Sequence, residues 1–204
     1  MGPTEARHYD LFMDVVLLGY YRHLIKRVVD KMGIQRGQSI LDLGSGTGRN
    51  DCFIAQKAGP EGRIIGLDIS KEMLNLSRKR CQSYPNVEFR EQRIEMPLTY
   101  QKAFDKVFTS FVLHGFEDSQ KVGIISNAYH ALKPGGVFCI LDYNEFNLEG
   151  PWSPLRWAFI HGECQLALEF LKLDLKEMLS SQGFSSFEEE LFLGEHLRLL
   201  KAAK

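Results

Sequence analysis

The sequence has almost no surplus of charge and no apolar segment long enough to cross a membrane. Its 25 lysine and arginine residues balance 26 aspartate and glutamate residues, for a formal net charge of −1. This balance leaves no basic field to hold a phosphate backbone, so we expect no nucleic-acid partner. The longest apolar run near the N-terminus, Val15 to Tyr21, is far too short for a bilayer and lacks the flanks of a signal peptide. We therefore expect a cytoplasmic protein.

Cysteine is also scarce. The four cysteines, Cys52, Cys81, Cys139 and Cys164, are widely separated and form no C-x-x-C pair. Each stands among apolar neighbours, so we expect small buried hydrophobic side chains rather than a disulfide framework or a zinc site.

The length and composition predict a single domain over residues 1–204. Hydrophobic residues make up 44% and charged residues 25% of the chain, as in soluble globular proteins. No internal repeat or low-complexity segment divides it. We expect an N-terminal helical cap (1–35), a central core (36–143), an insertion (144–171), and a closing helix and hairpin (172–204).

Short apolar segments alternate with helical ones in the core. The predicted strands cover residues 39–43, 63–68, 87–90, 104–110 and 137–143. Most of them are rich in Val, Ile, Leu and Phe without strict alternation, which favours a parallel sheet covered on both faces. The predicted helices cover residues 9–32, 71–81 (after the N-cap Ser70), 119–132 (after Asp118, ending at Pro134 and two glycines) and 173–183. Segments 186–192 and 195–202 are interpreted as a closing hairpin. The pattern predicts an α/β fold with a doubly wound, Rossmann-like, seven-stranded, mostly parallel sheet and a C-terminal antiparallel hairpin.

Three glycines at alternate positions follow the first predicted strand, in the stretch LDLGSGTGRN (41–50). Glycine lets the chain turn sharply there and lets a ligand approach the backbone at the carboxyl edge of the sheet. The spacing G-x-G-x-G differs from the G-x-G-x-x-G of dinucleotide sites. Asp42, just upstream, would repel a pyrophosphate but attract an ammonium group. The pattern therefore favours S-adenosylmethionine, which has a cationic amino-acid end, over a nicotinamide cofactor.

A second acidic residue, Asp68, ends the second predicted strand, 20 residues after Gly48. A carboxylate there can accept hydrogen bonds from both ribose hydroxyls, and Ile69 beside it can cover the adenine face. Asp68 alone does not discriminate, because NAD sites place an acid similarly and a helix N-cap partner would look the same.

Together these segments resemble the signature of the class I S-adenosylmethionine-dependent methyltransferases. ILDLGSGTG and IIGLDIS resemble its first and second motifs, FDKVFTSFVLHGFED the segment around its fourth strand, and ALKPGGVFCILDY the turn into its fifth. The segment YDLFMDVVLLGYYRHLIKRVVDKMG and the tail KEMLSSQGFSSFEEELFLGEHLRLLKA resemble the ubiquinone/menaquinone biosynthesis C-methyltransferases most closely. The short length also suits bacterial phospholipid N-methyltransferases.

The resemblance implies a set of cofactor contacts. Asp42 would hold the amino group of the methionine moiety, and Asp68 and Ile69 the ribose and the adenine. Gln92 stands where the family usually has Asp, and its amide oxygen would accept from the adenine amino group. The other implied contacts are the loop residues Gly44, Ser45 and Gly46, a backbone N–H at Arg93 or Ile94 for the adenine ring, Ser110 and Phe111 beside the sulfonium, and Tyr9 closing the site.

Methyl transfer requires no metal and no covalent enzyme intermediate, because the cofactor supplies the electrophile. A phenol or hydroquinol acceptor would also need a base for its hydroxyl proton. His114, after the fourth strand, is the first candidate for this base, although the quinone-biosynthesis family tends to have Arg at that position. His161 and Tyr143 are the alternatives. An ordinary polar loop residue is the other interpretation of His114.

Two segments have alternative interpretations. The aromatic insertion 144–171, with Trp152 and Trp157, would either wall an apolar substrate or pack as a lid on the sheet edge. The N-terminal helix would cap the cofactor cleft, and it also suits a peripheral contact with a membrane surface.

The predicted function is methyl transfer to a small apolar acceptor, a quinol precursor. Two alternatives stay open. One is transfer to a phospholipid amine or another small metabolite, and the other is cofactor binding without transfer.

Overall fold

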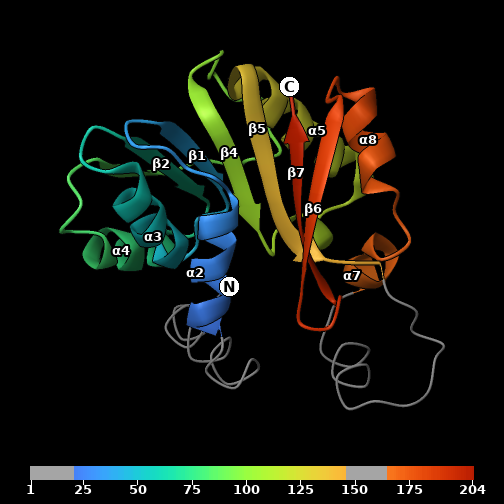
Figure 1. The fold of residues 1–204 in the computed structure, drawn as a ribbon, viewed down its shortest axis with the longest axis horizontal. Coiled ribbons are helices and arrows are strands. Elements are labelled where there is room, and N and C mark those ends of the chain that lie inside the picture. The colour runs from blue at the N-terminus through green and yellow to red at the C-terminus, as the bar shows by residue number, and fades with distance from the viewer. Residues whose placement is uncertain (1–20, 146–164) are drawn as a thin grey trace.

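The computed structural model describes residues 21–145 and 165–204 of the chain, which form a seven-stranded sheet with helices on both faces (Figure 1). Its strands lie in the order β3-β2-β1-β4-β5-β7-β6. The strands are β1 (Ser39–Leu43), β2 (Arg63–Asp68), β3 (Val87–Glu91), β4 (Phe104–Ser110), β5 (Leu132–Tyr143), β6 (Ser186–Phe192) and β7 (Leu197–Ala203). The helices are α2 (Tyr21–Lys31), α3 (Arg49–Ala58), α4 (Lys71–Arg80), α5 (Asp118–Ala131), α7 (Gln165–Phe170) and α8 (Leu175–Ser181), with a 3₁₀ turn η1 (Leu113–Gly115).

The first five strands pair in parallel, whereas β7 runs antiparallel to both β5 and β6. The predicted fold class and the C-terminal hairpin are therefore confirmed. The strand order reverses between β1 and β4, and this is the point at which open α/β sheets bind ligands at the carboxyl ends of their strands.

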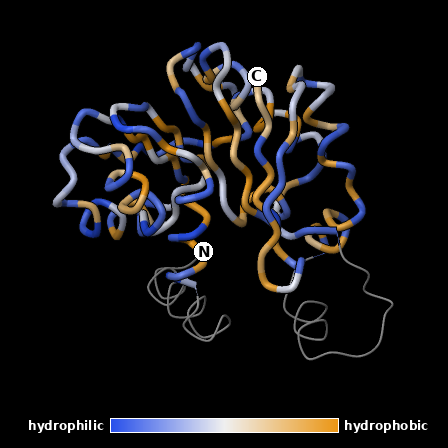
Figure 2. Tube along the Cα trace, viewed as in Figure 1, coloured by the Kyte–Doolittle hydropathy of each residue, from blue (hydrophilic) through white to orange (hydrophobic). Residues whose placement is uncertain are grey.

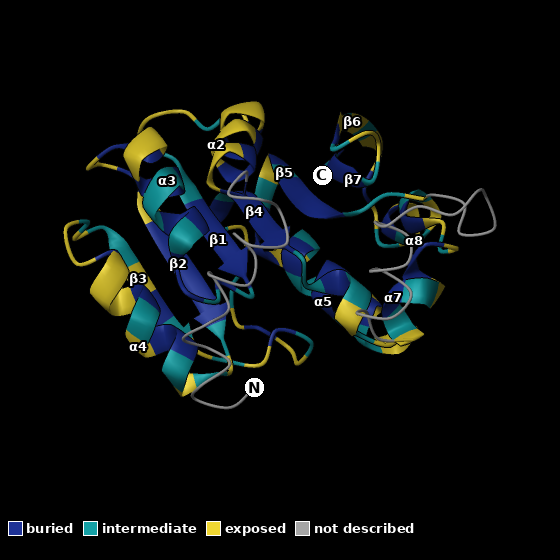
Figure 3. Ribbon diagram, turned by 90° about the horizontal axis from the view of Figure 1, so that it is seen from below, coloured by how far each residue is buried: buried dark blue, intermediate teal, exposed yellow. Residues whose placement is uncertain are grey.

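Successive hydrophobic side chains on β1 point to opposite faces of the sheet and pack into two different hydrophobic cores. Ile40 packs with α2 and α3 on one face, whereas Leu41 and Leu43 pack with α5 and α8 on the other. Successive side chains of a strand point to opposite faces, so a strand covered on both sides must be apolar at nearly every position. Figure 3 shows the central strands β1, β2 and β4 buried and the outer faces of the helices exposed, and Figure 2 shows hydrophobic and hydrophilic stretches in turn within the covering helices.

Most predicted boundaries agree with the structure, and the differences have local causes. Helix α5 begins at Asp118 rather than after it, because Glu117 is the N-cap and forms a capping box with Gln120. Strand β5 extends back to Leu132, so Pro134 and its glycines lie within it. A shift of the β4–β5 register between Phe104 and Lys106 accommodates them.

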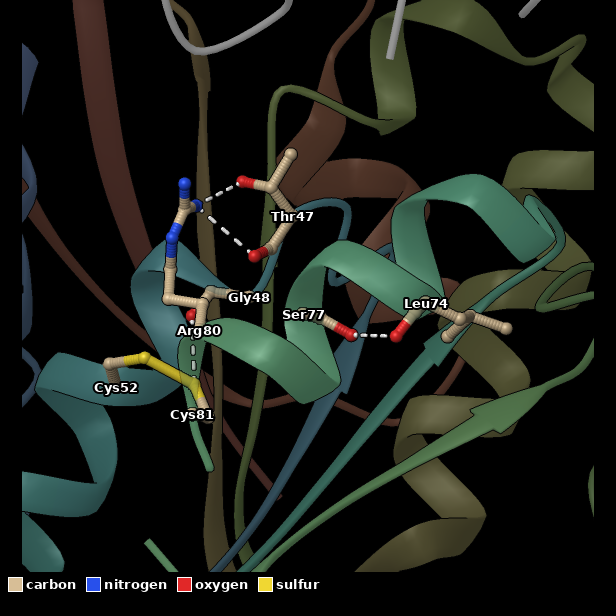
Figure 4. The surroundings of a disulfide bond; sticks show 7 residues. All are labelled: Thr47, Gly48, Cys52, Leu74, Ser77, Arg80 and Cys81. Carbon is tan, nitrogen blue, oxygen red and sulfur yellow. Dashed lines mark hydrogen bonds between the residues drawn. A yellow bond between two sulfur atoms is a disulfide. The ribbon is translucent and has the colours of Figure 1, made fainter. Parts of the chain in front are cut away.

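The prediction for two of the cysteines is wrong. Cys52 on α3 and Cys81 at the C-cap of α4 form a disulfide across a Cα–Cα distance of 5.6 Å (Figure 4). They are 29 residues apart, and only the side-by-side packing of α3 and α4 brings them together. Cys139 is free and buried, as expected, and Cys164 lies outside the described residues.

The end of α4 is also tied to the loop after β1. The guanidinium of Arg80, next to Cys81, donates to the carbonyl oxygen of Thr47 at 3.1 Å and to its hydroxyl (Figure 4). Helix α4, helix α3 and the glycine loop thus form one connected unit at the carboxyl edge of the sheet. No helix in the described part of the chain is long and apolar enough to cross a membrane.

Candidate cofactor and acceptor site

A cavity of about 450 Å³ lies at the carboxyl edge of the sheet, where β1, β2, β3 and β4 end. Ten of the twelve residues predicted to bind the cofactor line it: Gly44, Ser45, Gly46, Asp68, Ile69, Gln92, Arg93, Ile94, Ser110 and Phe111. Of the other two, Asp42 lies buried behind the loop, and Tyr9 lies outside the described residues. Segments spread over about seventy positions of the sequence thus converge on one space.

The glycine loop has a backbone that only glycine adopts easily. Gly44 has φ +86°, and a Cβ added there would lie 2.5 Å from a methyl carbon of Val112. Gly48 has φ +72°, and its Cβ would lie 2.7 Å from that of Ser77 on α4. A Cβ on Gly46, in contrast, would meet nothing within 4 Å. The loop is therefore packed closely against Val112 at Gly44 and against α4 at Gly48, and it is open at Gly46, as backbone recognition of a ligand requires.

The carboxylate of Asp68 is held in place by the backbone. Its Oδ2 accepts a hydrogen bond from Gly46 N–H at 2.9 Å, and its Oδ1 accepts one from Ser70 N–H at 2.8 Å. Each carboxylate oxygen has a second lone pair, so both can still accept a hydroxyl hydrogen. Ser70 is the N-cap of α4, as predicted. The N-cap interpretation and the ribose interpretation of Asp68 are therefore compatible.

The end of β4 forms the wall opposite Asp68. The side-chain amide of Asn50 donates to Ser110 Oγ at 2.7 Å and joins the start of α3 to this strand. Phe111 follows with φ +54°, a conformation that is costly for a bulky residue, and its ring lies 6.4 Å from the ring of Tyr21. The backbone strain turns Phe111 into the cavity.

Asp42 lies on β1 with no exposed surface, and neither of its carboxylate oxygens has a hydrogen-bond partner among the described residues. Burying hydrogen-bond acceptors without donors is unfavourable, so a ligand that supplies donors would be stabilised at these two oxygens. An ammonium group supplies both donors and a positive charge. The site therefore fits the methionine end of S-adenosylmethionine.

His114 on η1 is paired with a buried carboxylate that the sequence did not single out. Its Nδ1 lies 2.7 Å from Oδ1 of Asp142 on β5, and its ring lies 4.9 Å from the ring of Tyr143 and 6.5 Å from that of Phe170. His114 itself does not line the cavity, but Val112 and Phe116 on either side of it do. The histidine thus stands next to the cavity, among aromatic rings.

Several other side chains line the cavity although no motif pointed to them. The clearest are Tyr21, Thr47, Arg49, Asn50 and Met73. The guanidinium of Arg49 lies 5.2 Å from the centre of the Tyr21 ring, so a cation stands at the cavity wall. Residues 49 and 50 end the stretch LDLGSGTGRN, and their position at the start of the helix after the glycine loop could have indicated that they line the cavity. The predicted roles of His161, Trp152 and Trp157 fall outside the described residues.

Known proteins share this sequence pattern and this fold. A family described as "Methyltransferase domain" matches residues 34–183. The ubiquinone/menaquinone biosynthesis C-methyltransferase UbiE of Enterobacter sp. (strain 638) is 30% identical over 200 residues, which cover 96% of this chain and 73% of that protein.

Two solved structures show the same fold at low sequence identity. A SAM-dependent methyltransferase from Aquifex aeolicus has a TM-score of 0.66 at 17% identity, with 88% of each chain covered. Phosphoethanolamine N-methyltransferase 2 of Haemonchus contortus, in complex with S-adenosyl-L-methionine, has a TM-score of 0.69 at 18% identity, covering 89% of this chain and 52% of that one.

Proposed function

This chain belongs to the class I S-adenosylmethionine-dependent methyltransferases, near UbiE, and we propose that its acceptor is a small aromatic quinol precursor. The enzyme class and the cofactor follow from the family. The acceptor is proposed on one observation above all: a histidine fixed by a buried carboxylate stands among aromatic rings beside the cofactor cavity. The name of the Enterobacter relative points to the same chemical class.

The cofactor is proposed to lie across the carboxyl edge of the sheet. Asp42 and the glycine loop would receive the methionine moiety, Asp68 the ribose hydroxyls, and Gln92, Arg93 and Ile94 the adenine. Ile69 is 60% exposed, which is unusual for isoleucine, and covering an adenine face would remove that apolar surface from water. Ser110 and Phe111 would then flank the reacting sulfur.

When bound, the cofactor supplies an electrophilic methyl group on a sulfonium. The task of the protein is to align the acceptor with the methyl–sulfur axis and to exclude water, which contributes on the order of 7–11 kcal/mol in well-oriented systems. Phe111, Val112 and Phe116 provide apolar walls for this purpose. A planar aromatic acceptor would stack on such side chains at a low cost in conformational entropy.

Carbon methylation of a quinol ring is promoted by loss of a hydroxyl proton. The methylated ring carbon then loses its hydrogen as a proton, which restores the aromatic ring, and the oxygen is protonated again. We assign His114 as the acceptor of the hydroxyl proton, at Nε2. Asp142 Oδ1 accepts a hydrogen bond from the Nδ1–H of His114 and so favours the tautomer that leaves Nε2 unprotonated. Tyr143, the alternative base, has its ring packed against those of His114 and Phe111, and we assign it to the wall.

We also propose a cytoplasmic location, with contact to a membrane surface where a lipid-dissolved acceptor is collected. The segment predicted to make that contact is the apolar stretch 11–21 with the basic residues that follow it up to Lys31, and all of it but α2 lies in residues 1–20, outside the described part. Flotation with liposomes, comparing the full chain with a variant that lacks these residues, tests the membrane contact. Equal flotation of the two would contradict it.

Incubation of the enzyme with methyl-labelled S-adenosylmethionine and a panel of acceptors tests the proposed function. The panel contains prenylated quinols, simple phenols and phospholipid amines. We expect label in the quinols, at a ring carbon. Label in the amine fraction alone would refute the quinol assignment, and cofactor binding without any labelled product would favour a binding protein.

A further inference from the structure

Six buried side-chain oxygens among the described residues have no hydrogen-bond partner, and all of them lie within one stretch of ten residues. They belong to Asp42, Ser45, Asn50 and Asp51. Both carboxyl groups contribute both of their oxygens, and neither aspartate has any exposed surface. Unpartnered buried acceptors are rare in proteins, and a cluster of them marks a place where donors are expected.

The backbone directs the two aspartates toward each other. Asp42 lies two residues after Ile40 on β1, so it points to the same face of the sheet, the face that α2 and α3 cover. Asp51 lies in the first turn of α3, directly after the glycine loop. The two carboxyl groups lie close enough to interact, so a proton shared between them would satisfy one oxygen of each and leave the other oxygens as acceptors.

Burial raises the pKa of Asp42 well above its ordinary value, and the charge of Asp51 raises it further. Burial likewise raises the pKa of Asp51 to about 7. The other charged group that acts on the pair is Asp68 at the end of β2, which raises both pKa values. Near neutral pH the two aspartates therefore hold a proton between them, as facing carboxyl groups do elsewhere.

The remaining two members of the cluster open toward the cavity. Ser45 and Asn50 line it, and the Nδ2 of Asn50 is committed to Ser110, which leaves its Oδ1 as an acceptor. The cluster thus presents five carboxyl and amide oxygens that accept hydrogen bonds and one hydroxyl, that of Ser45, which can accept or donate. A primary ammonium, with three donors and a positive charge, is the chemical group that satisfies such an arrangement.

We propose that Asp51 is the second carboxyl group of an ammonium receptor whose first is Asp42, and that this pair gives up its shared proton when the ammonium of the cofactor enters. The inference rests on the placement of the cofactor in the proposed function. Before binding, the pair holds one proton and one negative charge. On binding, the proton passes to solvent, and the two carboxylates together face one positive charge. Asp51 is a positioning residue in this scheme, acting on the methionine end and not on the transferred methyl.

Calorimetry with two ligands isolates this role. S-adenosylhomocysteine carries the ammonium, whereas 5′-methylthioadenosine has the same nucleoside without the amino-acid end. We expect Asp51→Asn to weaken binding of S-adenosylhomocysteine about tenfold to hundredfold and to leave binding of 5′-methylthioadenosine unchanged. Asp105→Asn is the matched control. Asp105 lies on β4 away from the cavity, where it pairs with Lys133 and accepts from the Ser39 N–H, so both affinities should stay as in the wild type.

Measuring how many protons the wild type releases on binding tests the proposal even if Asp51→Asn does not fold. Titrations of S-adenosylhomocysteine at about pH 7 in phosphate and in Tris, which differ in ionisation enthalpy, should show release of a substantial fraction of one proton. The affinity should rise with pH across neutral pH for as long as the free pair still holds the proton that binding releases. Asp51→Asn should reduce both effects without abolishing them, because it removes the charge of Asp51 from the pair while the burial of Asp42 remains.

The outcomes separate the two proposals. Wild-type binding with the same heat in both buffers, or an Asp51→Asn variant that binds S-adenosylhomocysteine as tightly as the wild type, would overturn this inference alone. A folded wild type that binds neither S-adenosylhomocysteine nor S-adenosylmethionine would overturn the cofactor placement, and this inference with it.

Discussion

The Nδ1 atom of His114 lies 2.7 Å from Oδ1 of Asp142, a carboxylate that is 2% exposed. Asp142 also accepts a hydrogen bond from the backbone N–H of Tyr143 at 2.9 Å, so its orientation is fixed from two sides. A histidine held in this way presents a defined tautomer to whatever lies at its other nitrogen. In the proposed mechanism, strand β5 therefore supplies Asp142 to the site as well as pairing within the sheet.

Replacing His114 with Gln should lower kcat for a quinol acceptor by about 10² to 10⁴, the range for a general base. Affinity for S-adenosylmethionine should be unchanged. Asp142→Asn should lower kcat less, and it should shift the acid limb of the pH–rate profile because it changes the charge beside the imidazole. Steady-state kinetics with labelled cofactor measure both effects.

The matched control is His130→Gln. His130 is an exposed histidine near the C-terminal end of α5, bonded to the Ser126 carbonyl oxygen. This variant should behave as the wild type. A His114→Gln variant with wild-type kcat on the quinol would remove His114 from the mechanism.

Replacing Asp68 with Asn should weaken binding of S-adenosylhomocysteine and of 5′-methylthioadenosine to the same extent, about tenfold to hundredfold. Both ligands carry the ribose, and an amide presents only one acceptor to its two hydroxyls. This pattern differs from that of Asp51→Asn, which should separate the two ligands. Calorimetry gives the dissociation constants, and equal binding by wild type and variant would mean that the ribose lies elsewhere.

Reducing the Cys52–Cys81 disulfide should lower the free energy of unfolding by about 3 kcal/mol, because the bond closes a loop of 29 residues in the unfolded chain. Thermal unfolding with and without dithiothreitol measures this. A Cys52→Ser variant should melt at the lower temperature, and reductant should not change it further. If reductant lowered the melting temperature of Cys52→Ser as much as that of the wild type, the effect would not come from this bond.

The stability of the ligand-free protein should fall as pH rises toward neutral, because of Asp51. Its pKa is raised in the folded state from 3.8 to about 7, so the folded protein holds a proton that the unfolded chain loses. That stabilisation is full below about pH 3.8 and is lost as pH rises through about 7, at a rate on the order of 1 kcal/mol per pH unit between these limits. Denaturant unfolding at several pH values, compared with Asp51→Asn, isolates the contribution. A constant difference between the two proteins across this window would contradict it.

The strands and most of the cavity wall could be predicted from the sequence because they depend on local patterns. Segments 39–43, 63–68 and 104–110 are apolar runs between turns, and each matches an observed strand from end to end. The glycines and Asp68 stand at strand ends, which a parallel sheet brings to one edge. Ten of the residues predicted to bind the cofactor therefore line one cavity, although the prediction used no information about tertiary packing.

The features that the sequence did not reveal depend on the pairing of distant elements. Nothing in the sequence relates Cys52 to Cys81, and the packing of α3 beside α4 brings them together. Likewise, nothing in the sequence of its strand distinguishes Asp142, and η1 places His114 against it. Asp51 stands within ten residues of Asp42, but only the turn of the glycine loop brings the two carboxyl groups together. No period or spacing encodes such contacts, because they depend on how the elements pack in three dimensions.

The hydrogen bond from Asn50 to Ser110 joins the first turn of α3 to the tip of β4, across the place where the strand order reverses. In the proposed placement, one amide group then touches both ends of the reacting assembly: its oxygen faces the amino end of the cofactor, and its nitrogen holds the serine beside the sulfur. A shift at either end must move the other or break a buried bond. Asn50 would thus fix the distance between the anchor of the cofactor and its leaving atom, and a shorter side chain there would lose the oxygen that faces the ammonium and release Ser110 beside the sulfur.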